Sequence, residues 1–157
     1  ETKRLGFSTL LHGIGKAEIP DSILKAPRKL TSKEFNIMKR HPKLGEFLIK
    51  VKSGIDGGIA RGASEHHEKL DGSGYPLGVS GDEILPESRV LTVADVVEAM
   101  ASHRPYRPSI GLDKALEEIF KGREKLYDEQ VVNACLKLFN DKGFSFSEPK
   151  HALSPLS

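Results

Sequence analysis

The sequence predicts an all-α fold, a helical bundle of about six helices. Apolar residues take the i, i+3, i+4, i+7 spacing of a core-facing helix at Leu44, Phe47, Leu48 and Val51. The run from Thr31 to Glu34 has the pattern of a capping box, which predicts a helix with Thr31 as its N-cap. No stretch alternates apolar and polar residues over the length of a strand, so no sheet is expected.

Apolar spacing, prolines and glycines place the other elements. A first helix ends near Leu11 and carries His12, and Pro20 and Pro27 predict a loop before Thr31. Residues 59–70 are expected to be helical and residues 71–86, rich in glycine and proline, to form a long ordered loop. A central helix is expected over 86–101, followed by shorter helices over 112–120 and 128–139.

The length of 157 residues is that of a single domain with its own core. We expect this domain to occupy residues 1–142 and a polar C-terminal tail to occupy residues 143–157. Because the chain starts at Glu1 without a methionine and reaches His12 within one short helix, it reads as part of a larger protein.

Composition excludes several classes of function. The net charge of +2 is too small to predict a nucleic-acid partner or an anionic membrane surface. No run of about 20 apolar residues is present, so no membrane segment is expected in this chain. Cys135 is the single cysteine and lies in an amphipathic run, which indicates a core thiol and fits a cytoplasmic location.

The stretch from His66 to Pro76 is the most informative in the chain. Two imidazoles and two carboxylates precede a Gly-Ser-Gly-Tyr-Pro turn. Neutral imidazole is a common metal ligand, and glycine lets a backbone pass close to a ligand. Two metals about 3.5–4 Å apart can cleave a phosphodiester, and imidazole and carboxylate ligands suit such metals. The candidate ligands, each on or beside a predicted helix, are His12, His41, His66, His67 and Asp95.

Each candidate also has a structural interpretation. Taken alone, His41 in its basic surroundings is more typical of a solvated histidine. Asp95 interrupts an apolar helix, where a carboxylate is costly unless it is paired or metal-bound, so a functional role is favoured. For His66 and His67 the metal-ligand and the structural interpretation are equally favoured. Adjacent helical side chains point about 100° apart, so both rarely reach one small site.

A series of motifs covers the chain from Leu10 to Phe139. These are His-x-x-Gly-Lys at 12–16, Ile-Pro-Asp-x-Ile-Leu at 19–24, Leu-Thr at 30–31, His-Pro at 41–42, His-His-Glu-x-x-Asp-Gly-x-Gly-Tyr-Pro at 66–76, Val-Ala-Asp at 93–95 and Arg-Pro-Tyr-Arg at 104–107. In this order they resemble the HD-GYP family of cyclic di-GMP phosphodiesterases. The resemblance implies a helical bundle of the HD-superfamily type and metal-dependent hydrolysis of cyclic di-GMP to linear pGpG and GMP.

The resemblance also implies roles for individual residues. The five candidate ligands match family metal ligands of a di-metal centre, with iron or manganese expected and zinc or nickel as alternatives. Lys16 matches a catalytic lysine near the scissile phosphate. The substrate-binding positions of the family fall on Gly74, Tyr75, Pro76, Arg104 and Arg107.

Partners follow from the same resemblance. The expected ligand is cyclic di-GMP or a related cyclic dinucleotide, such as the mixed cyclic GMP-AMP. Family members often follow a receiver or sensor domain, so such a domain is expected upstream. A diguanylate cyclase-type partner and a homodimer are further expectations of this resemblance.

Gly13 is the main departure from the family pattern, which has an aspartate at this position of the HD motif. The missing carboxylate would bridge the metals, so we predict impaired metal occupancy and impaired catalysis. The resemblance also implies N-terminal helices that precede this segment in the family, and residues 1–142 are expected to lack them, which should impair catalysis further. Two alternatives stay open. The domain can act as a non-catalytic module that binds a cyclic dinucleotide or a partner, or as a phosphohydrolase of the wider HD superfamily that acts on a monoester.

Overall fold

The computed structural model describes residues 2–53, 55, 57–102 and 109–146. Within these residues the chain is helical, and the β pairing there is one isolated bridge between Arg123 and Tyr127. The described residues form eight α-helices, six of them with eight or more residues, which confirms the predicted all-α class. The elements are α1 (Thr2–Leu11), η1 (Ile14–Glu18), α2 (Asp21–Leu24), α3 (Ser32–Met38), α4 (His41–Ser53), α5 (Gly57–Ser64), η2 (Gly81–Glu83), α6 (Pro86–Ala101), α7 (Leu112–Lys121) and α8 (Glu129–Lys142).

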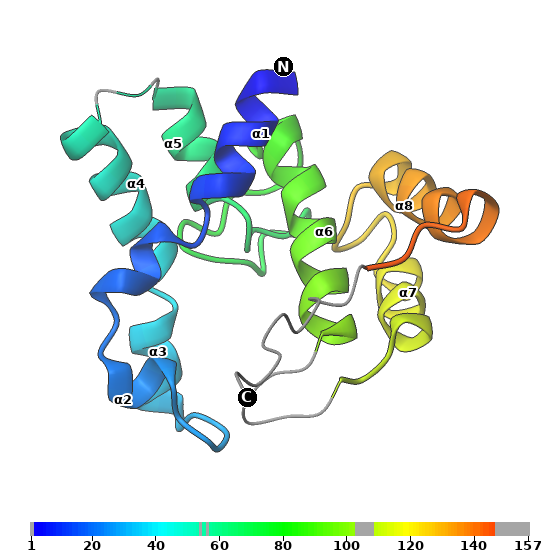
Figure 1. Cartoon of the computed structure of the whole chain (residues 1–157). Helices are drawn as coiled ribbons and strands as arrows, with labels where there is room; N and C mark the ends of the chain where they lie inside the picture. Colours follow the sequence, from blue (N-terminus) through cyan, green and yellow to red (C-terminus); the bar gives the residue numbers. More distant parts are fainter. Residues whose placement is uncertain (1, 54, 56, 103–108, 147–157) are drawn as a thin grey trace, which may run out of the picture.

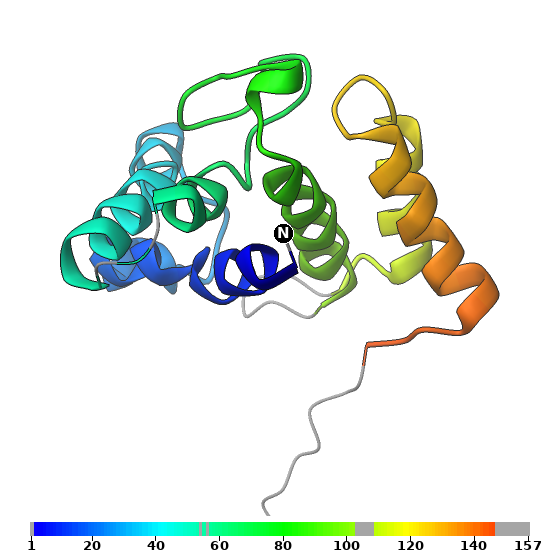
Figure 2. The ribbon, with the colours of Figure 1, turned by 90° about the horizontal axis from the view of Figure 1, so that it is seen from above.

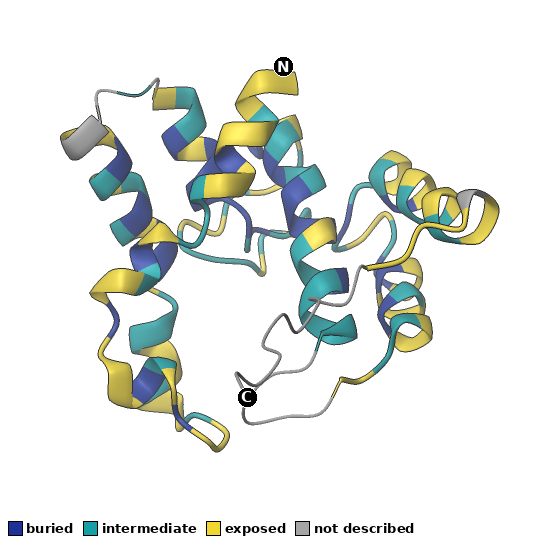
Figure 3. Ribbon diagram, viewed as in Figure 1, coloured by how far each residue is buried: buried dark blue, intermediate teal, exposed yellow. Residues whose placement is uncertain are grey.

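Helix α6 stands at the centre of the fold. It contacts α1 and α5 on one side and α7 and α8 on the other, as the two perpendicular views show (Figures 1 and 2). Apolar side chains of α6, α7 and α8 form one buried cluster, which includes Val93, Val97, Ala115, Ile119 and Val132. A smaller cluster joins α4 and α5 through Ile49, Ala60 and Ala63. Figure 3 shows buried residues on α4, α5 and α6 and on the segment that leads from α5 toward α6.

Several predicted boundaries are correct. The Thr31 hydroxyl accepts a hydrogen bond from the Glu34 amide, and the Glu34 carboxylate accepts one from the Thr31 amide, so the capping box is formed. The central helix spans 86–101 as predicted. Helix α8 spans Glu129–Lys142 and so runs three residues beyond the predicted end at 139, and Gly143 then takes the left-handed conformation (φ 61°) of a C-cap glycine.

Two predictions about local structure are wrong. The helix expected over 59–70 ends at Ser64, and residues 65–70 form turns and irregular backbone. The cause is long-range: Glu65 and Glu68 are buried carboxylates that bind backbone amides of residues 77, 78 and 85. The stretch between Pro20 and Pro27, expected as a loop, contains the short helix α2, and η1 precedes it. Among the described residues, no helix has the length and apolar character needed to cross a membrane.

Candidate metal centre

Four histidines and one aspartate meet where α1, α4, α5 and α6 approach each other. His12 follows the last residue of α1, His41 is the first residue of α4, and Asp95 lies on α6. His66 and His67 lie in the turn after α5. The ring centroids of His66 and His67 are 4.0 Å apart, so two adjacent residues do reach one site. The objection that adjacent helical side chains diverge fails because this segment is not helical.

Three of these imidazoles are oriented in the same way. The Nδ1 atoms of His12, His41 and His66 lie 2.6, 2.9 and 2.6 Å from the backbone carbonyl oxygens of Thr9, Met38 and Ala63. A carbonyl oxygen can only accept a hydrogen bond, so each Nδ1 must carry the proton. In the neutral ring Nε2 then presents a lone pair. This arrangement, with one nitrogen bonded to a carbonyl and the other free, is typical of metal-ligating histidines.

The free nitrogens of His41 and His66 point at each other. Their Nε2 atoms are 3.2 Å apart, and each side chain is at most 2% exposed. Two lone pairs that face each other in a buried site have no hydrogen between them, so a shared cation is the natural partner of both. Ligand atoms of His41, His66 and His67 all lie within 4.8 Å of one another. The donor set therefore fits a transition metal that accepts imidazole.

Asp95 adds the negative charge at this centre. One carboxylate oxygen lies 3.8 Å from His12 Nε2 and the other 3.9 Å from His67 Nδ1. The side chain of Asp95 is 20% exposed, so it lies at the edge of the site, on the side open to solvent. These distances leave Asp95 able to face a cation held by the histidines.

Burial keeps the buried imidazoles neutral near pH 7. Removal from water lowers the pKa of His41 to about 4, that of His66 to about 3 and that of His67 to about 2, because a low-polarity environment penalises the charged form. The positive charge of Lys16 lowers all three further. Neutral imidazole is the form that binds metal.

Gly13 lies next to His12, and the space where its side chain would point is open. Its φ of −87° and ψ of −5° suit any residue, and a Cβ built on it has no atom within 4 Å. An aspartate would therefore fit here without strain. Because position 13 is glycine and not aspartate, Asp95 is the one carboxylate among the five candidate ligands. The described residues therefore fit a cation but supply less negative charge than the motif of the resembled family.

The Gly-Tyr-Pro loop folds back onto the two histidines. The Tyr75 amide donates to the His67 carbonyl (3.2 Å), and the Tyr75 ring stacks on the His67 ring. Glu68, 1% exposed, accepts hydrogen bonds from the amides of Leu77 and Gly78. Gly74 passes so close that an added Cβ would lie 2.5 Å from backbone atoms of residues 67–69. These contacts explain the close spacing of glutamate, glycine and tyrosine in this motif.

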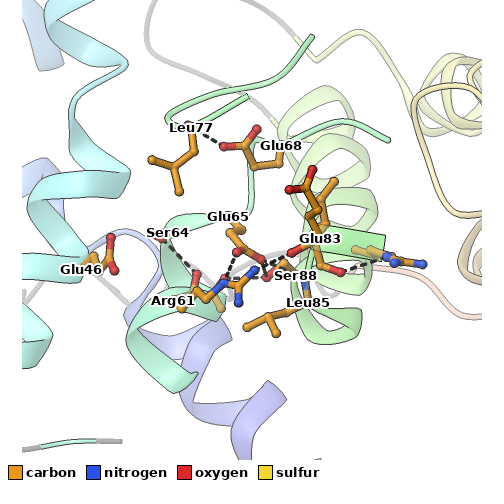
Figure 4. A network of polar contacts seen from close by, with 12 residues as sticks. Glu46, Arg61, Ser64, Glu65, Glu68, Leu77, Glu83, Leu85 and Ser88 are labelled. Atoms are coloured by element: carbon orange, nitrogen blue, oxygen red, sulfur yellow. Dashed lines mark hydrogen bonds and ion pairs between the residues drawn. The ribbon is translucent and has the colours of Figure 1, made fainter. Parts of the chain in front are cut away.

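A second buried carboxylate ties the same segment to α6. Glu65 is fully buried and accepts hydrogen bonds from the Leu85 amide (2.9 Å) and the Ser88 hydroxyl (3.0 Å), while Arg61 pairs with its other oxygen (Figure 4). Arg61 also donates to the Glu83 carbonyl. The turn that carries His66 and His67 is thus fixed on both sides, by Glu65 and by Glu68.

A cleft of about 660 Å³ opens beside the histidines. His41, His67, Asp95 and Tyr75 line one part of it, and α2, α3 and the segment between them line the rest. Three cationic residues, Lys16, Arg28 and Lys29, belong to its lining. The cleft has the size of a small-molecule site and combines a metal-binding end with positive charge, which suits a phosphate-containing ligand.

The sequence-predicted site residues divide into three groups. The five candidate ligands come together, and Lys16 and Tyr75 line the adjacent cleft. His41 is buried, so its interpretation as a solvated histidine is wrong. Gly74 and Pro76 flank Tyr75 in the half-buried loop. Arg104 and Arg107 lie outside the described residues.

Sequence reasoning missed several residues of this region. Arg28, Lys29 and Phe35 line the cleft, and Glu65 fixes the turn of His66 and His67 to the start of α6. A signal existed for two of them, because Arg28 and Lys29 form a basic pair just before the predicted helix start at Thr31. Nothing in the local pattern marks Phe35 or Glu65.

Comparison with known proteins identifies a family for this helical fold and its histidine cluster. The family model described as "HD domain" matches residues 1–131. The chain belongs to the HD domain family and is of the HD-GYP type. Among solved structures it is similar to Bd1817, an HDG"Y"P protein from Bdellovibrio bacteriovorus, with a TM-score of 0.66 and 19% identity over 87% of this chain and 44% of that one. This likeness shows the shared fold.

Curated relatives are more similar in sequence. The chain is 42% identical over 139 residues to the cyclic di-GMP phosphodiesterase response regulator RpfG of Xanthomonas campestris, and 45% identical over 133 residues to a cyclic di-GMP phosphodiesterase of Thermotoga maritima. It is 38% identical over 133 residues to the 3'3'-cGAMP-specific phosphodiesterase 3 of Vibrio cholerae. These matches cover 87%, 84% and 85% of this chain, but only 36%, 36% and 29% of the relatives.

Proposed function

We propose that this HD-GYP domain is a metal-dependent phosphodiesterase-type domain that binds a cyclic dinucleotide. The reaction of the family is hydrolysis of cyclic di-GMP to linear pGpG and GMP, and we propose that this reaction is impaired in this chain. The observation that carries the proposal is the pair of facing Nε2 atoms of His41 and His66, 3.2 Å apart, with both Nδ1 atoms bonded to backbone carbonyls. The names of the curated relatives support the substrate class.

In this proposal the five candidate ligands hold iron or manganese, with zinc and nickel as alternatives. When bound, the metals supply a nucleophile at neutral pH and positive charge beside the phosphate. Lys16 lines the cleft beside His41 and His67, where its ammonium group can stabilise the phosphate charge or give a proton to the leaving oxygen. Tyr75, between Gly74 and Pro76, borders the nucleotide, and Arg104 and Arg107 bind its phosphates.

Gly13 supports a second candidate function. Without its carboxylate the centre holds less negative charge, while the cleft and its cationic lining are retained. Such a domain can bind a cyclic dinucleotide, or a partner domain, without hydrolysing it. We therefore predict weak or absent catalysis for this chain.

The cellular setting belongs to the same proposal. We place the domain in the cytoplasm, downstream of a receiver or sensor domain, with a diguanylate cyclase-type partner and a homodimer as possible assemblies. Support comes from the relatives, which are much longer than the matched region, and one of which is named a response regulator.

The test compares four proteins loaded with manganese or iron: the chain as given, Gly13→Asp, Gly13→Ala and His66→Ala. We expect Gly13→Asp to hydrolyse cyclic di-GMP at least about 10-fold faster than the chain as given, because a ligand carboxylate is restored. Gly13→Ala adds a side chain without a carboxylate and should match the chain as given. His66→Ala should lose bound metal, measured by elemental analysis.

The outcomes separate the two candidates. If only Gly13→Asp hydrolyses cyclic di-GMP, the glycine at position 13 is what prevents catalysis in an otherwise complete site. Metal and nucleotide binding without turnover in every variant favours the non-catalytic module. Unchanged metal content in His66→Ala would contradict the assignment of the centre itself.

A further inference from the structure

The cleft extends from the histidines to an apolar part that the proposed function does not yet use. Leu30, just before α3, and Phe35 and Met38 on α3 line this part. Phe35 is 45% exposed although it is a large aromatic residue next to other apolar side chains. Exposed aromatic rings inside a concave site are typical of places where a planar ligand group stacks.

Lys39, the C-cap residue of α3, is not itself a lining residue, but its ammonium group lies close to two aromatic rings that line the cleft. Its ammonium nitrogen lies 4.9 Å from the centroid of the Phe35 ring and 5.6 Å from that of the Tyr75 ring. In the described part of the chain no carboxylate pairs with this ammonium group. Lys39 therefore offers hydrogen-bond donors at the border of the cleft, between the Tyr75 ring beside the histidines and the Phe35 ring of the apolar part.

The shape of the cleft sets where each part of a nucleotide can lie. Its two ends are continuous, because His67, Tyr75 and Phe35 line the same space. A phosphate at the histidines, close to Lys16, directs the attached nucleoside along the cleft toward α3. The group that arrives at Phe35 and Lys39 is then a nucleobase.

We propose that Phe35 and Lys39 form a nucleobase subsite that prefers guanine to adenine. The proposal rests on the proposed function, since it assumes a cyclic dinucleotide in the cleft. Phe35 supplies the stacking surface, which accepts any base. Lys39 supplies the selection, because an ammonium group has donors and no acceptor. Guanine presents two acceptors, O6 and N7, on one edge, whereas adenine presents N7 beside an amino group that is itself a donor.

The curated relatives make base selection a real question for this domain. Two are named for cyclic di-GMP and one for 3'3'-cGAMP, which replaces one guanine by adenine. The subsite predicts that this chain favours the ligand with two guanines. Because Lys39 lies outside the metal centre, the prediction concerns affinity and base choice and leaves metal content unchanged.

The test measures binding of hydrolysis-resistant phosphorothioate analogues of cyclic di-GMP and cyclic di-AMP to manganese-loaded protein by calorimetry. The variants are Lys39→Met, Lys39→Arg and Phe35→Ala, with Lys33→Met as the matched control, since Lys33 is an exposed lysine on the same helix that, among the described residues, is not placed over the Phe35 or Tyr75 ring. Circular dichroism and metal content verify that each variant is folded and loaded.

We expect the unchanged chain to bind the cyclic di-GMP analogue at least about 10-fold more tightly than the cyclic di-AMP analogue. Lys39→Met should reduce that ratio toward one, Lys39→Arg should keep it, and Lys33→Met should leave it as it is. Phe35→Ala should weaken both ligands by about 10-fold or more, because stacking does not depend on the base.

An unchanged ratio in Lys39→Met, with metal and binding intact, would overturn the subsite and leave the proposed function standing. A Lys39→Met variant that loses both ligands equally would also overturn it, because Lys39 would then act on the phosphates. If the metal-loaded, unchanged chain bound neither analogue, the proposed function and the subsite would fall together.

Discussion

The ring of Tyr75 lies stacked on the imidazole of His67, with 4.7 Å between the centroids and 27° between the planes. The stack joins the Gly-Tyr-Pro loop to a candidate metal ligand, and the hydrogen bond from the Tyr75 amide to the His67 carbonyl supports it. The other three histidines each have a backbone carbonyl beside Nδ1, and among the described residues His67 has none. Its ring is positioned by the Tyr75 stack together with the neighbouring rings of His41 and His66.

We expect Tyr75→Leu to lower the affinity for manganese by about 10-fold, because His67 loses the surface that orients it. Tyr75→Phe keeps the ring and should bind manganese as tightly as the unchanged chain. Metal titration followed by calorimetry checks both. If Tyr75→Leu kept full affinity, the tyrosine would serve the nucleotide alone.

Glu68 should control the order of the same loop. Its buried carboxylate satisfies the amides of Leu77 and Gly78, and Glu68→Ala leaves both without a partner. The expected loss in the free energy of unfolding is about 2–3 kcal/mol. Faster amide hydrogen exchange at these two residues is the local measurement.

Glu117→Ala is the control for Glu68→Ala. Glu117 pairs with Lys121 on the exposed face of α7, and an exposed pair of this kind contributes little. Equal losses in the two variants would show that the loop does not depend on the buried carboxylate.

Local sequence signals predicted the helices well. The capping box at Thr31 was readable because its donors and acceptors lie within four residues. The central helix α6 was readable because Pro86 stands at its first turn and its apolar positions repeat with helical spacing. Such features need no knowledge of the rest of the chain.

The site was harder to predict because long-range contacts build it. The turn at His66 and His67 exists because Glu65 binds the start of α6 and Glu68 binds the loop at 77–78. His41 is buried because η1 packs against the start of α4, where a Cβ on Gly15 would meet the His41 carbonyl oxygen. The family motifs nevertheless identified the five residues that the fold brings together, since motif order carries information that periodicity lacks.

Two glycines near the site should respond in opposite ways to alanine. A Cβ on Gly74 would lie 2.5 Å from backbone atoms of Glu68 and Lys69, so Gly74→Ala must displace the loop. We expect a loss of more than about 2 kcal/mol in the free energy of unfolding. Gly13 has open space and ordinary backbone angles, so Gly13→Ala should gain about 0.4–1 kcal/mol by restricting the unfolded chain.

Urea denaturation of both glycine variants measures these changes. The comparison also tests the interpretation of the Gly13→Asp activity experiment, because it separates the effect of any side chain from that of a carboxylate. A destabilised Gly13→Ala variant would mean that the space beside the centre is not free.

The protonation state of Glu34 affects Arg28, one of the residues that line the cleft. Its carboxylate accepts two hydrogen bonds from Arg28, a cleft residue, and one from the Thr31 amide, each 2.8 Å long. The Arg28 hydrogen bonds, followed by those from Thr31, lower the pKa of Glu34 to about 2. Because the folded-state pKa lies below the usual 4.5, this contribution to stability is complete above about pH 4.5 and disappears as the pH falls through about 2.

We therefore expect Glu34→Gln to have a lower melting temperature than the unchanged chain at pH 6, and the difference to shrink as the pH is lowered from 4.5 toward 2. Protonation of Glu34 also releases Arg28, which then no longer holds a fixed position at the cleft. Melting curves of both proteins across this pH range, with an NMR titration of the Glu34 carboxyl group, measure the two effects. A difference in melting temperature that stayed constant down to pH 2 would show that the glutamate acts through its shape and not through its charge.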